Sequence, residues 1–300
     1  MGIWKEALYM LAKIKYPPFL AILAAALYAL STPFSKLLLE HVSSAMLAAL
    51  LYLGAGAGLL AVRIVHPRAV LRGKEQPLAR EDLPYTAAMV LLDIAAPVCM
   101  MFGLRAASAA NVSLLNNFEI VATSLIALLL FREAVSARLW LAIGLITAAS
   151  MLLCFEGADS LRFSSGSVLV LLACVCWGFE NNCTRKLSAK DPVEIVIVKG
   201  FGSGLGALAL AFGVGERLPQ IRDLLWALLL GFAAYGLSIL FYIYAQRAIG
   251  AAKTSVYYAC APFLSAGLSL LLHAGAPSVS FLASLAVMAL GVYFASTGQK

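Results

Sequence analysis

The sequence predicts an all-α integral membrane protein, in which ten transmembrane helices form two inverted five-helix repeats. The first observation is the composition, since 62% of the 300 residues are apolar and 12% are charged. A soluble domain is about 45–50% apolar and about 25% charged. The second is that the apolar residues gather in windows of about twenty, the length that crosses a hydrocarbon core about 30 Å thick. The third is a repeat between the two halves of the chain.

Ten windows are long and apolar enough to span a bilayer, and charged or turn-forming residues separate them. They cover residues 18–39, 44–65, 84–104, 107–130, 137–155, 167–187, 193–214, 223–246, 251–272 and 279–297. Ahead of the first window, residues 1–16 carry Trp4, Leu8, Leu11 and Ile14 at helical spacing. This pattern predicts a short amphipathic helix that lies in the membrane interface.

The basic residues give the orientation, because the cytoplasmic loops of membrane proteins carry an excess of Lys and Arg. With the N terminus inside, sixteen basic residues fall in cytoplasmic segments and five in outer segments. The five are Lys36, Arg105, Arg162, Arg217 and Arg222. We therefore expect a multi-pass protein of the inner (plasma) membrane with both termini in the cytoplasm, which requires an even number of spans.

The composition also disfavours other classes of protein. The net charge is +7, but the basic residues stand at segment ends and form no stripe with aromatic residues, so we expect no nucleic-acid partner. The six cysteines fall in or beside apolar windows without a neighbouring histidine, which predicts packing residues rather than a metal site. The three histidines stand at span ends, and no nucleophile–base pair is evident. We expect no catalytic residue, metal or cofactor, and hence no enzyme.

Two stretches in the first half of the chain read like stretches in the second. Leu104–Ser113 matches Gln246–Ser255 at an offset of 142, and Tyr28–Lys36 matches Trp177–Arg185. A five-span unit has an odd number of spans, so its two copies cross the membrane in opposite directions, as in transporters that bind substrate near the midplane. Chance matching of helices rich in Ala and Leu is the alternative. The predicted repeats cover residues 17–156 and 163–298.

Several short motifs keep a characteristic order along the chain. They are Arg105 to Ala109, Phe131-Arg132-Glu133, Gly144, Trp177-Gly178, Arg247 to Ala251, and Pro262. In this order and spacing the chain resembles the EamA-type branch of the drug/metabolite transporter superfamily. Where that family carries a Gly-Glu pair at the end of the ninth span, this chain has His273-Ala274-Gly275-Ala276. Where it carries Pro in the fourth span, this chain has Glu119-Ile120.

The resemblance implies a carrier of ten helices that moves small metabolites, amino acids or drugs by alternating access. It also implies a central cavity lined by the first, third and fourth spans of each half. Export from the cytoplasm is the commoner direction in such relatives.

Glu119 lies within the fourth predicted span, where an ionisable residue is costly and by default functional. Asn116, Glu119 and Thr123 follow at spacings of three and four, so they share one helix face, and Asn117 stands beside it. We predict that Glu119 binds a proton or a cation. The structural alternative is a protonated Glu119 that joins helices by hydrogen bonding to asparagine.

Glu180 lies in the sixth predicted span, in the sequence from Trp177 to Asn182. We expect Gly178 and the two asparagines to interrupt the helix and to free carbonyl groups for a ligand, as in the broken helices of transporters. The alternative is that Glu180 forms an ion pair with Arg185 or Lys186, about one turn away.

Asp93 precedes Pro97 by four residues in the third predicted span, so the carbonyl of residue 93 lacks its usual helical donor. In the repeat alignment Asp93 stands opposite Tyr235, and Asn116 stands opposite Tyr258. We expect Asp93 and Tyr235 to line opposite walls of one cavity. Interfacial anchoring or core packing remains the alternative for the tyrosines. We expect Lys199 to extend towards the headgroups.

Together these observations predict a secondary active transporter that moves a small metabolite, amino acid or organic cation, with proton-coupled export. Its expected partners are a cationic or zwitterionic small molecule, protons and the lipid bilayer, and it acts as a monomer or dimer. The alternatives are a uniporter or importer of a small solute and, outside the carriers, a channel or a membrane scaffold. We expect proton coupling at Glu119 and Glu180. The predicted substrate-binding residues are Asp93, Asn116, Asn117, Glu119, Trp177, Glu180, Asn181, Tyr235 and Tyr258.

Overall fold

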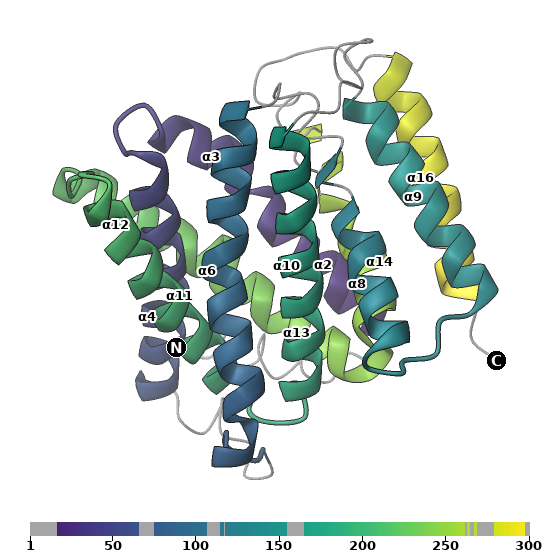
Figure 1. Cartoon of the computed structure of the whole chain (residues 1–300), viewed down its shortest axis with the longest axis horizontal. Coiled ribbons are helices and arrows are strands. Elements are labelled where there is room, and N and C mark those ends of the chain that lie inside the picture. The colour runs from purple at the N-terminus through teal and green to yellow at the C-terminus, as the bar shows by residue number, and fades with distance from the viewer. Residues whose placement is uncertain are drawn as a thin grey trace. The chain divides into compact units, whose positions relative to one another are not determined.

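The computed structural model describes residues 17–65, 75–106, 115–116, 118–154, 165–261, 263–264, 267–268 and 279–297 (Figure 1). Within these residues the secondary structure is helical, apart from one isolated parallel β-bridge between Gln76 and Lys190. The predicted all-α class is therefore confirmed for the described part of the chain. The interfacial helix predicted over residues 1–16 lies outside the described residues, and so does Asn117.

The helices follow the predicted windows closely. In the first half of the chain they are α2 Pro17–Ala29, α3 Ser31–Leu38, α4 Ser44–Val65, the 3-10 turn η1 Arg80–Asp82, α6 Leu83–Ala106, α8 Phe118–Leu129 and α9 Ala137–Cys154. In the second half they are α10 Ser165–Leu187, α11 Pro192–Gly213, α12 Ile221–Leu230, the π-helix η3 Gly231–Leu237, α13 Ser238–Ile249, α14 Ala251–Tyr258 and α16 Val279–Thr297.

Six helical stretches of the described chain are long and apolar enough to cross a membrane, and three shorter apolar helices accompany them. The six are Pro17–Ser35, Ser44–Val65, Arg80–Met100, Ser165–Leu187, Pro192–Gly213 and Ile221–Ile249. The membrane class predicted from composition is therefore supported by helix length, while the number of ten spans stays a prediction.

The chain forms two compact units, each drawn from both halves of the sequence. Unit 1 contains the described residues within 1–87 and 184–249, and unit 2 contains those within 88–183 and 250–300. Helices α6 and α10 each contribute residues to both units. Each unit is described by itself below.

Unit 1 is built around the close packing of α4 against α11, which glycine makes possible. A Cβ atom added to Gly200 of α11 would lie 2.5 Å from the backbone nitrogen of Gly56 in α4. Likewise, a Cβ atom on Gly204 would lie 2.9 Å from the backbone nitrogen of Leu53. The two backbones are therefore in direct contact, as is common where small residues line the interface of membrane helices.

Polar contacts fix both ends of this helix pair. At the start of α4, the backbone nitrogen of Met46 donates to Glu216, which follows α11, over 2.7 Å. At the end of α4, Arg63 forms an ion pair of 3.3 Å with Asp191, which caps the start of α11. The two helices therefore run antiparallel. A carboxylate at each helix start satisfies backbone N–H groups that have no partner inside the helix.

The π-helix η3 interrupts the regular α-helix between α12 and α13 and faces α4. A Cβ atom on Gly231 would lie 2.2 Å from the carbonyl oxygen of Leu51, and one on Gly236 would lie 3.2 Å from the Cα atom of Ala55. A π-helical turn inserts one additional residue into the helix and shifts the faces that follow. The shift sets both glycines of η3 against α4.

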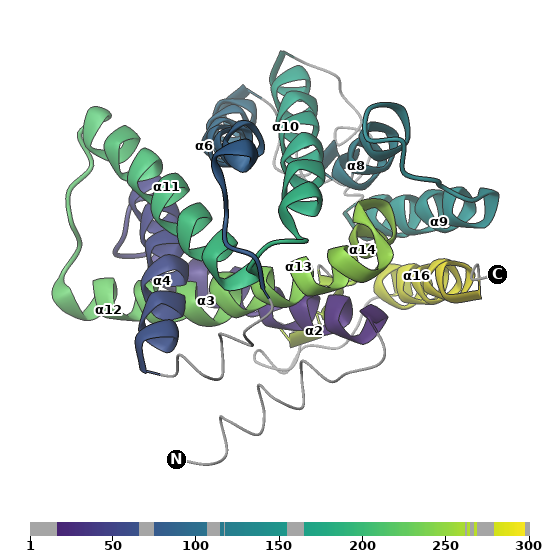
Figure 2. The same ribbon diagram turned by 90° about the horizontal axis from the view of Figure 1, so that it is seen from below.

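Unit 2 contains two further antiparallel helix pairs. Helices α9 and α16 lie side by side in both views (Figures 1 and 2), and Arg138 at the start of α9 donates to the carbonyl of Thr297 at the end of α16 over 3.3 Å. Helices α8 and α14 are also in contact. Glu133, just after α8, accepts from the backbone nitrogens of Ala251 and Ala252 over 3.0 and 3.3 Å. The end of α8 therefore meets the start of α14.

Candidate functional site

The candidate site lies in unit 2, where α8 and α10 pack closely. A Cβ atom on Gly178 of α10 would lie 2.9 Å from the backbone nitrogen of Thr123 in α8. Further towards the start of α10, the thiol of Cys174 donates to the carbonyl of Leu115 over 3.4 Å. Further towards its end, Asn182 Nδ2 donates to the carbonyl of Thr123 over 3.0 Å. Residue numbers rise together along both helices, so α8 and α10 run parallel.

The expected break in the sixth span is wrong, because α10 is one continuous helix from Ser165 to Leu187. Gly178 serves the close approach to α8 instead of ending the helix. The carbonyl of Gly178 accepts a hydrogen bond of 2.8 Å from Asn182 Nδ2 in the next turn of the same helix. The asparagine therefore binds this carbonyl group and does not leave it to a ligand.

Glu119 and Asn181 meet across the two helices. Asn181 Nδ2 donates to Glu119 Oε1 over 3.1 Å and to the hydroxyl oxygen of Thr123 over 3.2 Å. Asn181 and Thr123 are buried, while Glu119 is half-buried. A membrane-embedded carboxyl group is thus held by an amide donor from a neighbouring helix.

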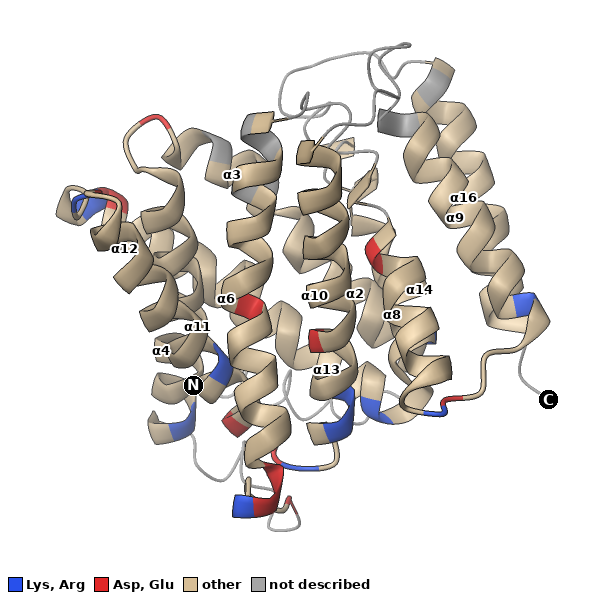
Figure 3. Cartoon of the chain, in the orientation of Figure 1, with Lys and Arg blue, Asp and Glu red and all other residues tan. Residues whose placement is uncertain are grey.

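Asp93 and Glu180 lie at similar depth on α6 and α10. A Cβ atom on Gly103 of α6 would lie 3.0 Å from the carbonyl of Gly166 and 2.7 Å from a methyl carbon of Val170, so the end of α6 lies beside the start of α10. Ten residues separate Asp93 from Gly103, and ten separate Val170 from Glu180, which is about 15 Å along each helix. Both carboxyl groups are buried, with exposures of 2% and 3%. Acidic residues within α6 and α10, away from the helix ends, are visible in Figure 3.

The other predicted residues of unit 2 are placed as follows. Trp177 is half-buried on α10, and Tyr258 is half-buried at the end of α14. Asn116 lies beside Cys174, and the thiol sulfur of Cys174 is 3.6 Å from the backbone carbonyl oxygen of Asn116. On α14 the tyrosine next to the predicted one, Tyr257, is the fully buried residue, at 1% exposure.

Tyr235 belongs to unit 1, in the π-helix η3. Its ring packs edge-to-face against Tyr28 at 5.5 Å and against Tyr52 at 5.4 Å between ring centroids. One turn later, the hydroxyl of Ser238 donates to the carbonyl of Ala24 in α2 over 2.8 Å. Tyr235 is thus part of an aromatic cluster inside unit 1. Because Asp93 belongs to unit 2, the idea that the two line opposite walls of one cavity stays a prediction.

The structure gives Asn182 and Lys199 other roles than the sequence predicted. Asn182 was expected to help interrupt the helix, but it is completely buried and joins α10 to α8. Lys199 is 6% exposed within α11, so the expectation that it extends to the headgroups is wrong. Its signal was that it stands alone among the apolar residues of the seventh predicted span.

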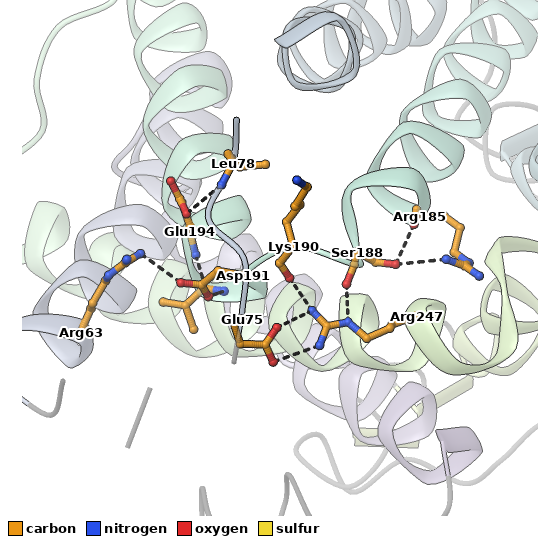
Figure 4. A network of polar contacts seen from close by, with 10 residues as sticks. Arg63, Glu75, Leu78, Arg185, Ser188, Lys190, Asp191, Glu194 and Arg247 are labelled. Carbon is orange, nitrogen blue, oxygen red and sulfur yellow. Dashed lines mark hydrogen bonds and ion pairs between the residues drawn. The ribbon is translucent and has the colours of Figure 1, made fainter. Parts of the chain in front are cut away.

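A separate polar network lies at the end of unit 1 where α11 begins (Figure 4). Both Nη atoms of Arg247 bind the carboxylate of Glu75 at 3.0 Å, and the same guanidinium donates to the carbonyls of Ser188 and Lys190. Lys190 forms ion pairs with Asp82 and Glu81. Hydrogen bonding to Asp82 raises the pKa of Lys190 above its ordinary value of 10.5, so the ammonium group is charged at neutral pH.

In the same network, the backbone nitrogen of Leu78 donates to Glu194 over 3.2 Å, as Figure 4 shows. The segment before α6 is therefore tied to the connection between α10 and α11 and to the end of α13. These charged groups lie at helix ends and differ in this from Asp93 and Glu180, which lie well inside α6 and α10.

The model of the EamA-like transporter family matches residues 16–155 and again residues 164–297 of this chain. The chain belongs to the EamA-like transporter family. An uncharacterized transporter from Methanothermobacter thermautotrophicus is 26% identical over 254 residues, which cover 79% of this chain and 73% of that protein. A solved crystal structure of a protein shares the fold with a TM-score of 0.75 at 21% identity, over 93% of this chain and 95% of that chain.

The EamA-like family and the apolar helices together make this protein a membrane transporter. The resemblance to the drug/metabolite transporter superfamily inferred from motifs is thereby confirmed.

Proposed function

We propose that this EamA-like protein is a secondary active transporter that moves a small organic cation or zwitterion by alternating access, with proton-coupled export. The observation that carries this proposal is that the carboxyl groups of Asp93 and Glu180 lie buried within two apolar helices of one unit. A carboxyl group at such depth costs several kcal/mol or more, and such groups by default face a substrate or ion pathway. A membrane scaffold has no function that requires buried carboxyl groups.

Three carboxyl groups support a cationic or zwitterionic substrate. Asp93, Glu119 and Glu180 all belong to unit 2, where they give its interior a negative character. Trp177 and Tyr258 add aromatic faces that can attract a cation. Coupling follows if substrate and proton compete for the same carboxylates, because each then favours a different state of the transporter.

The helix pairs of each unit support the inverted repeat. Helix α4 pairs antiparallel with α11, α8 with α14 and α9 with α16. In the predicted order of spans these are the second with the seventh, the fourth with the ninth and the fifth with the tenth. Antiparallel contact between equivalent helices is what a two-fold axis in the membrane plane produces.

The charge distribution in unit 1 supports an inner-membrane protein with cytoplasmic termini. Arg63, Lys190 and Arg247 gather at one end of α4 and α11, and Glu216 lies at the other end. By the positive-inside rule, the basic end faces the cytoplasm.

Transport by proteoliposomes tests the proposal. We expect wild-type protein to move an organic cation against its gradient when a proton gradient is imposed. Glu119→Gln keeps the shape and an acceptor oxygen but cannot change charge, so proton-driven accumulation should be lost in a folded protein. Glu40→Gln, in the exposed turn before α4, is the matched control. Undiminished proton-driven accumulation by Glu119→Gln would refute the role of Glu119.

A further inference from the structure

Asn182 has a buried acceptor oxygen that no donor in the described part of the chain reaches. Its side chain is completely buried on α10, and Oδ1 has no hydrogen-bond partner among the described residues. A second buried amide oxygen of this kind, Oδ1 of Asn116, lies on the same seam between α8 and α10. Buried amide oxygens are nearly always hydrogen-bonded in native proteins. Among the described residues, Asn182 Oδ1 is thus an acceptor that the hydrogen-bond donor of a ligand can satisfy.

The orientation of the Asn182 amide is fixed by its other contacts. Nδ2 donates to the carbonyl of Thr123 over 3.0 Å and to the carbonyl of Gly178 over 2.8 Å. A flipped amide would set Oδ1 against two carbonyl oxygens, which accept and cannot donate. Oδ1 therefore points away from the carbonyl groups of Thr123 and Gly178. It is free to accept a hydrogen bond from a donor that is not one of these two residues.

A carboxyl group lies near the amide of Asn182. Asn181, the neighbour of Asn182, holds Glu119 Oε1, and both asparagines contact Thr123. Glu119 lies one helical turn from Thr123 on α8, so its carboxyl group and the Asn182 amide lie on neighbouring turns. A group that satisfies both must carry positive charge and hydrogen atoms that it can donate.

We propose that Asn182 Oδ1 accepts a hydrogen bond from the ammonium group of the substrate, while Glu119 balances its charge. The substrate class is then an amine that carries at least one N–H bond when protonated, and quaternary ammonium compounds are excluded because they have no N–H group. This inference rests on the proposed function, in which Glu119 binds a cation, and it adds the rule by which cations are selected.

A bare metal ion fits these groups less well. Helices α8 and α10 are regular here, so their carbonyl groups are engaged in the helices, and those of Thr123 and Gly178 also bind Asn182. Alkali and alkaline-earth ions prefer several oxygen ligands at once. An acceptor oxygen near a carboxyl group matches an organic group that bears N–H bonds.

The test compares butylamine with its N-methyl, N,N-dimethyl and N,N,N-trimethyl forms, all cations at neutral pH. Purified protein in nanodiscs is melted with each compound, since a ligand of the folded state raises Tm in proportion to its affinity. We expect affinity to fall as N–H bonds are replaced, with the trimethyl form at least about tenfold weaker than butylamine. Pentylamine controls for the added volume and should bind about as well as butylamine.

Variants at two neighbouring residues distinguish the effect of the Asn182 oxygen from the effect of the Glu119 carboxyl group. Asn182→Leu removes the acceptor and should make the four affinities equal within about twofold, a difference of less than one hydrogen bond. Asn181→Leu removes a donor to Glu119, so it should change all four affinities by a similar factor and keep their ratio. If Asn182→Leu yields no folded protein, the wild-type series alone decides.

A trimethyl form that binds wild-type protein as tightly as butylamine would overturn this inference and leave cation binding by Glu119 intact. Stabilisation by sodium chloride but by none of the amines would assign the seam to a metal ion and overturn it too. A protein that no amine stabilises contradicts both this inference and a cationic substrate.

Discussion

Nδ2 of Asn181 lies 3.1 Å from Oε1 of Glu119, so one side-chain hydrogen bond joins α10 to a carboxyl group on α8. The same nitrogen lies 3.2 Å from the hydroxyl oxygen of Thr123. The Asn181 amide therefore bridges two polar groups of α8 and holds α10 against that helix.

Replacing Asn181 with Ala should weaken the contact between α8 and α10. The amide of Asn181 donates to Glu119 and Thr123, and a buried polar group that loses its partner costs about 1–3 kcal/mol. Thermal unfolding in detergent should show the loss as a lower Tm. An unchanged Tm in the Ala variant would argue against a stabilising role of this contact.

Replacing Gly200 with Ala should destabilise unit 1. The added methyl group would lie 2.5 Å from the backbone of Gly56, which cannot move without displacing α4. Such overpacking costs about 1–3 kcal/mol. Thermal unfolding in detergent should show the loss as a lower Tm. Gly213→Ala in the same helix, where a Cβ atom meets nothing within 4 Å, should leave Tm unchanged or raise it.

Removing the carboxylate of Glu133 should weaken the start of α14. Glu133 accepts from the backbone nitrogens of Ala251 and Ala252, and the loss of such a cap costs about 1 kcal/mol. Glu133→Gln keeps one acceptor oxygen and should lose less stability than Glu133→Ala. Hydrogen exchange of the amides at residues 251 and 252 locates the effect. Equal protection in wild type and both variants would contradict the capping role.

The native cysteines offer a test of how α6 and α10 pair. Cys99 lies one turn before Gly103 on α6, and Cys176 lies nearly two turns after Val170 on α10, so both thiols lie on the same side of the contact between Gly103 and Val170. A short bifunctional thiol reagent should link them within one molecule, and a protease site inserted between residues 154 and 165 would reveal the link after cleavage. Cys99→Ser should abolish it, whereas Cys260→Ser should have no effect. Separate fragments from wild-type protein after such treatment would show that the pairing is wrong.

The helix boundaries could be predicted from the sequence because the bilayer fixes the length of a span. The second window, 44–65, coincides with α4, and the seventh, 193–214, differs from α11 by one residue at each end. Apolar windows and charged connections are properties of short segments, so one sequence is enough to find them.

Contacts between helices could not be predicted in the same way. Gly178 was interpreted as a helix breaker because glycine is flexible in isolation, but its role here is set by Thr123 of another helix. The π-helix η3 likewise depends on how Gly231 and Gly236 meet α4. Asp93, Glu119 and Glu180 were identified because any charge in an apolar window stands out, whereas the partner of each depends on the fold.

The direct backbone contact between Gly56 and Gly200 has a mechanical consequence. Two helices whose backbones touch cannot slide or roll past each other without steric overlap. No flexible side chains lie between them that could move aside. Salt bridges and caps hold their ends as well. Helices α4 and α11 should therefore travel as a rigid body throughout the transport cycle, and the bending that transport requires must fall on other helices.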